Sequence, residues 1–201
     1  MRLILYFLRS RGLWRLAVRT LVVLFVVTLC APIASAQTVL LNGTNAIGTI
    51  LANTTNSYTF TATHGDSVVV RVGQLTSTGY FNPWLRIYGP DGALVGSGAI
   101  AGDNAEEVAL TATNSGTFTV LVSDGNYGGY SGTGTYQLDY LKVPGDYVVP
   151  VGDEGGPLTN GTLNAGTISV GDLDAWSFTA TNGDSVVVRV GQLTSADYFN
   201  P

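Results

Sequence analysis

A 42-residue segment occurs twice in this 201-residue chain, and the repeat constrains the fold more than any other feature. Residues 160–201 align without gaps to residues 42–83 and are identical at 27 of 42 positions. The stretch from Gly65 to Ser77 recurs unchanged as Gly183 to Ser195. The offset of 118 residues is too long for a solenoid unit. It suits a globular domain of about 100 residues followed by a linker.

The repeat divides the chain into segments. We expect a first complete domain over residues 37–142 and a linker over residues 143–159, which are rich in Pro, Gly and acidic residues. Residues 160–201 then begin a second copy of the domain. Because residues 84–142 have no counterpart in it, we expect this second copy to be truncated.

Apolar and polar residues alternate through the first copy. Val68, Val70 and Val72 take every second position, and the same pattern recurs around Phe60, Val108, Val120 and Leu138. A period of two in segments rich in Val, Thr, Tyr and Phe is typical of half-buried antiparallel strands. Turn-forming Gly, Pro, Asn and Asp residues separate these segments. We predict an all-β antiparallel sandwich, jelly-roll-like, with about eight strands.

The first 36 residues have the order of a secretory signal peptide. An Arg-rich start is followed by the apolar residues 21–31 and by Ala34-Ser35-Ala36 before Gln37. Two alternatives are weaker. Lipid attachment at Cys30 would need a small residue where Leu29 stands, and a permanent anchor would need ~20 apolar residues without the interruption at Pro32. We therefore predict a protein that is secreted or at the cell surface, with no membrane attachment after cleavage.

The charge of the remaining residues excludes several functions. Beyond residue 36 the chain has four cations and 14 anions, a formal charge of 4 − 14 = −10. Such an acidic surface does not attract nucleic acid. A single His and a single Cys cannot form the usual Cys/His zinc site.

The candidates for catalysis are few. His64 lies in a Thr-His-Gly-Asp turn and is replaced by Asn182 in the second copy, so we interpret it as a turn residue. Glu106 and Glu107 are adjacent in a predicted strand and would point to opposite faces, which does not suit a catalytic pair. We expect no enzymatic activity within this chain.

Three motifs, taken in order, resemble the bacterial pre-peptidase C-terminal domain family. They are residues 57–68 (Ser-Tyr-Thr-Phe-Thr-Ala, then Gly-Asp-Ser-Val), the hairpin of residues 83–92, and residues 116–120 with residues 134–138. The resemblance covers residues 42–142 and, in part, 160–201. It implies a small, non-catalytic β-sandwich found on secreted proteins, often in tandem and often beside a peptidase domain. The family is also similar to collagen-binding modules of bacterial collagenases, some of which hold calcium.

Calcium is the candidate ligand that the residues suggest most directly. Asp172 and Asp174 stand at positions i and i+2 at the entry to a predicted strand, where they would share one face. Their counterparts in the first copy, Thr54 and Asn56, carry no charge. Residues 103–107 (Asp-Asn-Ala-Glu-Glu) could donate from a loop. The alternative is that both segments are solvated acidic turns.

Tyr127 and Tyr130 are the candidate ligand-binding residues. They lie in the Gly-rich loop of residues 124–134, from which exposed rings could stack on sugars or peptides. Alternatively, they pack over the end of the sandwich. Trp84 and Tyr88 could form a ligand platform, but we favour core packing, with Arg86 snorkelling or stacking beside them.

The predicted function follows from these points. We expect a non-catalytic exported β-sandwich repeat module that acts in binding, spacing or stabilisation within a larger secreted or surface protein. One alternative is an accessory domain of a secreted peptidase or other hydrolase whose catalytic domain lies outside this chain. Another is a calcium-dependent module whose partner is an extracellular polysaccharide or protein.

Overall fold

The computed structural model describes residues 37–99, 104–125 and 131–194. These residues form eleven strands and no helix, so none of them belongs to a helix able to cross a membrane. The strands are β1 (Thr38–Val39), β2 (Asn45–Ile50), β3 (Thr55–Ala62), β4 (Ser67–Thr78), β5 (Pro83–Tyr88), β6 (Leu94–Ala99), β7 (Ala105–Thr111), β8 (Gly116–Asp124), β9 (Thr133–Val143), β10 (Gly155–Pro157) and β11 (Ala175–Ser177).

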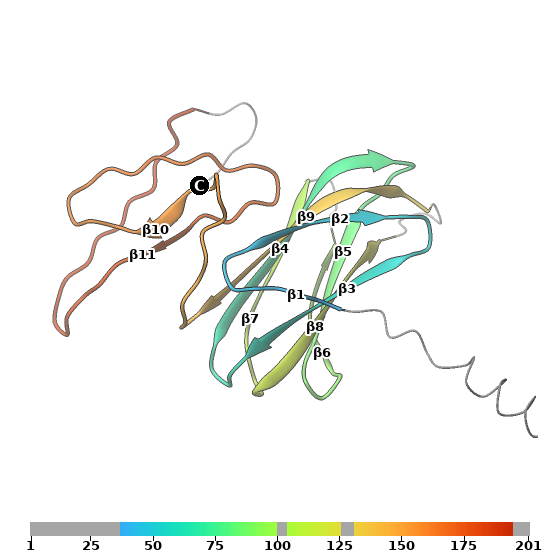
Figure 1. Cartoon of the computed structure of the whole chain (residues 1–201), viewed down its shortest axis with the longest axis horizontal. Helices are drawn as coiled ribbons and strands as arrows, with labels where there is room; N and C mark the ends of the chain where they lie inside the picture. Colours follow the sequence, from blue (N-terminus) through green and yellow to red (C-terminus); the bar gives the residue numbers. More distant parts are fainter. Residues whose placement is uncertain (1–36, 100–103, 126–130, 195–201) are drawn as a thin grey trace, which may run out of the picture. The chain divides into compact units, whose positions relative to one another are not determined.

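Strands β2 to β9 form an antiparallel sandwich (Figure 1). One sheet has the order β2-β9-β4-β7 and the other β1-β3-β8-β5-β6. Without the two-residue β1, each sheet has four strands, and consecutive strands of the chain cross between the sheets at most steps. This is the strand order of a jelly roll, so the predicted fold class is confirmed. The pairing of β1 with β3 is parallel and departs from the predicted antiparallel arrangement.

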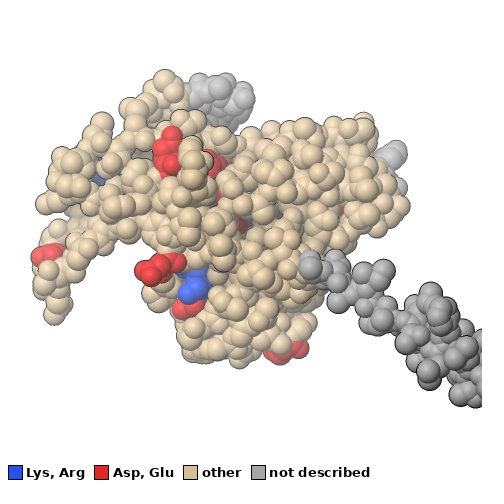
Figure 2. All heavy atoms as spheres, viewed as in Figure 1, with Lys and Arg blue, Asp and Glu red and all other residues tan. Residues whose placement is uncertain are grey.

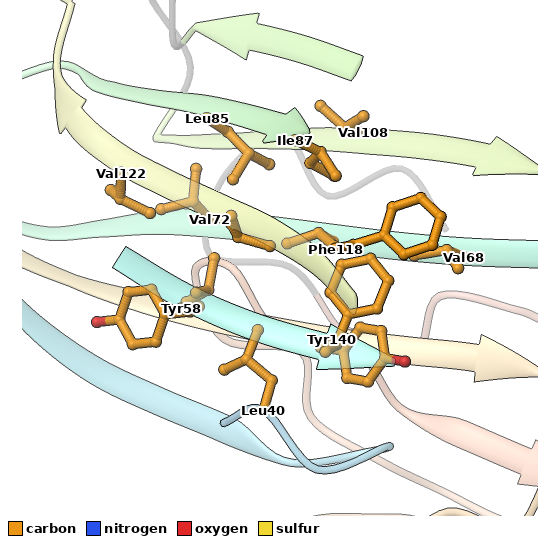
Figure 3. Close-up of a cluster of buried hydrophobic side chains, with 14 of the residues drawn as sticks. Leu40, Tyr58, Val68, Val72, Leu85, Ile87, Val108, Phe118, Val122 and Tyr140 are labelled. Carbon is orange, nitrogen blue, oxygen red and sulfur yellow. The ribbon is translucent and has the colours of Figure 1, made fainter. Parts of the chain in front are cut away.

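The predicted alternation places one set of side chains between the two sheets. Val68, Val70 and Val72 of β4 are at most 1% exposed. Side chains from both sheets interleave in the core (Figure 3). Phe60 of β3 pairs directly with Phe118 of β8, and their rings stack with centroids 5.1 Å apart. Continuous burial of this kind stabilises the fold through the hydrophobic effect and close packing.

Lys142, near the end of β9, ties the last long strand to the turn before β4. Its Nζ lies 2.9 Å from the Oδ2 of Asp66, a carboxylate that also accepts a hydrogen bond from the backbone N–H of Thr63. These contacts hold the pKa of Asp66 below its ordinary value, the Thr63 hydrogen bond contributing most and Lys142 adding to it. The turn and the strand are thereby joined across 76 residues of sequence (142 − 66).

The chain beyond the sandwich has little regular structure. β10 and β11 pair in parallel, with Gly155 opposite Ala175. Residues 178–194 form no strand, although most of them repeat the sequence of β3 and β4. The part of the chain around β10 and β11 nevertheless positions the acidic side chains of Asp153, Asp172 and Asp174.

Candidate cation site

A tight turn over residues 169–172 positions the first of the predicted acidic residues. The backbone N–H of Asp172 donates to the carbonyl of Ser169 at 3.2 Å, and Oδ2 of Asp172 accepts from the N–H of Ser169 at 3.2 Å. Gly171 supplies the positive φ of 86° that the turn requires. The side chain of Asp172 is buried, and its Oδ1 accepts a hydrogen bond from the N–H of Leu173. The turn therefore directs a buried carboxylate inward.

The parallel pairing of β10 and β11 brings two further carboxylates to this point. Asp153 stands two residues before β10, and Asp174 stands directly before β11. Because the first residues of the two strands are in register, the residues that precede them lie close together. One carboxylate oxygen from each of Asp153, Asp172 and Asp174 lies within 4.8 Å of the others. We call these three residues the acidic cluster.

The electrostatics of the acidic cluster favour the uptake of positive charge or protons. Burial raises the pKa of Asp174 to about 6, and the charges of Asp172, Asp153 and Glu154 add to the effect. The pKa of Asp153 is raised as well, mainly by burial and then by Asp172. Oδ1 of Asp174 is buried without a hydrogen-bond partner among the described residues. Repulsion between carboxylates and an unpaired buried oxygen are what a bound cation would relieve.

Asp139 of β9 adds a fourth carboxylate from the sandwich itself. It is only 5% exposed, and its Oδ2 has no hydrogen-bond partner within the described part of the chain. Its pKa is raised to about 7, mainly by burial; the charges of Asp172 and Asp153 contribute to this rise, and Gln137 and Arg71 oppose it. The field of the acidic cluster therefore reaches a buried residue of the sandwich.

Gly166 packs closely against the acidic cluster. A Cβ added at this position would stand 2.6 Å from Oδ2 of Asp174 and 3.4 Å from Cβ of Glu154. Any other residue would therefore push a side chain against the carboxylate.

Asp172 and Asp174 lie close together, as the sequence predicts, but not through the predicted strand geometry. They do not share the face of a strand, because Asp172 ends a turn and β11 begins only at Ala175. The contact arises from the turn and from the pairing with β10. In the first copy, Asn56 takes the place of Asp174 and donates hydrogen bonds to the hydroxyl of Tyr136 and the carbonyl of Thr49. That position is used there for internal packing.

Two of the four carboxylates were missed in the sequence. In the sequence, Asp153 belongs to the predicted linker, although it precedes a Gly-Gly-Pro segment that pairs as a strand. Asp139 lies between the inward-facing Leu138 and Tyr140 on the outward side of β9, a position that normally carries a solvated residue. Asp139 is buried because a segment distant in the sequence covers the outward face of β9, and the alternation of residues within β9 does not show this.

The other candidates lie elsewhere. Tyr127, Tyr130 and Asp103 fall outside the described residues. Glu106 and Glu107 are in β7 and are not part of the acidic cluster. His64 lies in the exposed turn before β4, where its N–H donates to Ser115.

The prediction that Trp84 and Tyr88 are core residues is wrong. They alternate with the buried Leu85 and Ile87 and are half-buried on the outward side of β5. The predicted stacking is present, because the guanidinium of Arg86 lies 4.2 Å from the centroid of the Trp84 ring.

Figure 2 shows that charged atoms are few on the visible face and that most of them are acidic.

Comparison with known proteins extends these observations. Residues 54–124, which span β3 to β8, match the family model of the bacterial pre-peptidase C-terminal domain. The resemblance inferred from the sequence motifs is thereby confirmed for this segment. The acidic cluster and Asp139 lie outside the matched residues. No curated protein shows a significant match to the sequence.

Three solved structures show likenesses of low identity. The pre-peptidase C-terminal domain of collagenase from Bacillus anthracis aligns with a TM-score of 0.44 and 18% identity, covering 55% of this chain and 99% of that one. PliG from Aeromonas hydrophila, a periplasmic inhibitor of g-type lysozyme, aligns with a TM-score of 0.40 and 14% identity, covering 53% and 95%. PliG from Salmonella Typhimurium gives 0.37 and 14%, covering 54% and 99%.

Proposed function

Because the chain carries a bacterial pre-peptidase C-terminal domain over residues 54–124, we propose that it is a non-catalytic exported module of a larger secreted or surface protein. Its role would be to bind, space or stabilise. The observation that carries the proposal is a complete, filled jelly roll followed by a recurrence of its own sequence, an arrangement suited to tandem modules. A role as accessory domain of a secreted hydrolase fits the same observation, with the catalytic domain outside this chain.

Export can be tested with the intact chain in a bacterial host. We expect the protein in the periplasm or medium, with an intact mass corresponding to a first residue of Gln37, because Ala34-Ser35-Ala36 matches the pattern cleaved by signal peptidase. Protein that remains in the membrane with the leader attached, or with a lipid on Cys30, would refute this part of the proposal.

The acidic cluster supports a second, more specific proposal: the module takes up calcium. Three carboxylates whose oxygens lie within 4.8 Å, without a nitrogen or sulfur ligand in the group, suit a hard cation. Calcium accepts six to eight oxygens in flexible geometry, whereas magnesium demands a near-ideal octahedron. A cluster assembled from a turn and two strand starts is better matched to the more tolerant ion.

Calorimetric titration of the intact chain with calcium, after removal of metal by a chelator, tests this proposal. Asp174→Asn should weaken binding by about tenfold or more, since the charge count of the ligands sets the affinity. Asp184→Asn is the matched control, because Asp184 lies in the same copy and caps a different turn. Absence of heat at millimolar calcium, or an equal affinity of the two variants, would rule out the cluster as a calcium site.

A further inference from the structure

The outward face of β4 makes an unusual contact with the second copy. Gly73 points outward from this strand yet is buried. A Cβ added to Gly73 would stand 2.5 Å from the Cα of Gly171 and 2.5 Å from the carbonyl oxygen of Val170. A Cβ added to Gly171 would stand 2.6 Å from the Cα of Gly73. The two backbones therefore touch at a pair of glycines, and neither position has room for a side chain.

A hydrogen bond fixes the orientation of this contact. Nη1 of Arg71, two residues before Gly73 on the same face, donates to the backbone carbonyl of Asp172 at 3.0 Å. Asp139 lies opposite Arg71 on the neighbouring strand β9 and is 5% exposed despite facing outward. The turn of residues 169–172 thus covers a polar patch of the first domain.

From these contacts we propose that the outward face formed by Arg71, Gly73 and Asp139 is a docking surface for the next copy of the domain. Its ligand is the turn of residues 169–172, and its function is to hold successive copies in one orientation. The proposal does not depend on calcium, since it uses a backbone contact and a hydrogen bond to a carbonyl.

The corresponding turn of the first copy lacks the features that allow docking. Residues 51–54 form the same turn, in which the N–H of Thr54 donates to the carbonyl of Leu51 at 3.1 Å. The position of Gly171 is occupied by Asn53, which has a φ of 60° and a side chain. That side chain would meet the backbone of Gly73. The contact is therefore directional: the turn of a following copy fits, and the turn of the first copy does not.

The glycine repeats provide matched controls. Gly191 is the counterpart of Gly73 within an identical sequence, and a Cβ there would meet nothing within 4 Å. Gly161 has a φ of 78°, close to that of Gly171, and it is also free of neighbours within 4 Å. Gly191→Ala therefore controls for the local sequence, and Gly161→Ala controls for backbone strain at a positive φ.

The test measures the distance distribution between two spin labels by pulsed electron resonance, in the intact chain with chelator present. Cysteines replace the exposed Thr117 and Leu163, and Cys30→Ser removes the single natural thiol. We expect one narrow distribution in the parent, in Gly191→Ala and in Gly161→Ala. We expect a broad distribution in Gly73→Ala and Gly171→Ala.

Gly171→Ala keeps the test decisive if Gly73→Ala disturbs the sandwich, because Gly171 lies outside it. Near-UV circular dichroism checks that the sandwich is intact in each variant. A broad distribution in the parent, or a narrow one in Gly171→Ala, would overturn the proposal. Failure of calcium to bind would leave the expected distances unchanged, so the two proposals can fail separately.

Discussion

Two stretches of identical sequence have different structures in this molecule. Residues 67–73 form the centre of β4, whereas residues 185–191 form no strand. Val70 is fully buried and Val72 likewise, while their counterparts Val188 and Val190 are 59% and 76% exposed. The same sequence therefore has a buried and an exposed form within one chain.

The turns of the two copies, in contrast, are alike. The N–H of Thr63 donates to Oδ2 of Asp66 at 2.9 Å, and the N–H of Thr181 donates to Oδ2 of Asp184 at 2.7 Å. The intervening glycines, Gly65 and Gly183, have φ values of 95° and 97°. These turns close within four residues and need no distant partner.

The comparison separates local from long-range determinants of this fold. β4 pairs with β7 and β9 on its two sides, and β3 pairs with β8. Those partners occupy residues 105–143, and residues 160–201 contain no counterpart of them. Side-chain alternation fits a sequence for a strand, but the strand forms only where neighbours complete its hydrogen bonds and cover its apolar face.

The largest predicted difference between the copies concerns their equivalent phenylalanines. Phe60 is 1% exposed and stacks on both Phe118 and Tyr140, whereas Phe178 is 50% exposed. Phe60→Ala should lower the free energy of unfolding by about 3–5 kcal/mol, since it leaves a cavity in the core. Phe178→Ala should change it by less than about 0.5 kcal/mol.

Urea unfolding followed by circular dichroism measures both values. Both variants are made in the same chain, so the rest of the chain contributes equally to the two unfolding free energies. Similar losses of stability in the two variants would show that the second copy contributes a core of its own.

A smaller difference is predicted for the aspartates that cap the equivalent turns. Both Asp66 and Asp184 accept a backbone hydrogen bond, but only Asp66 also pairs with Lys142. The folded state lowers the pKa of Asp66, so its stabilising contribution is complete above the ordinary value of 3.8 and is lost as the pH falls through the folded value. Asp66→Asn should remove this part of the acid sensitivity, and Asp184→Asn should not.

Thermal melting at a series of pH values from neutral down to about pH 3 reveals the effect. At neutral pH, Asp66→Asn should melt below the parent chain, and the gap should narrow as the pH falls. A gap that stays constant with pH would mean that the carboxylate charge at this turn does not contribute to stability.

The sequence predicts the sandwich well because the alternation of apolar side chains and the turn-forming residues are local patterns that recur from strand to strand. The alternation around Phe60, Val70, Val120 and Leu138 placed each of these side chains in the core, and Gly and Asp residues marked the turns. Residues 65–77 and 183–195 are identical, so the local pattern predicts strands in both copies, and only the lack of counterparts of residues 105–143 within residues 160–201 indicates that the copies differ. The two copies differ in strand content because β7, β8 and β9 pair with the strands of the first copy only.

The candidate site was predictable only in part for the same reason. Asp172 and Asp174 are near each other in sequence, so their contact follows from local geometry. Asp153 joins them through the pairing of β10 with β11, and Asp139 is buried by a turn 30 residues later in the chain (169 − 139). The glycine contact between Gly73 and Gly171 likewise has no local sequence signature.

Backbone hydrogen exchange, resolved by NMR, tests the central claim most directly. Because residues 67–73 and 185–191 have identical sequences and neighbours, their intrinsic exchange rates are equal, and any difference reports structure alone. We predict that the amides of Val68 to Val72 exchange only through global unfolding of the sandwich. Those of Val186 to Val190 should exchange near the intrinsic rate. Equal protection of the two segments would contradict the conclusion that distant strands decide which copy folds.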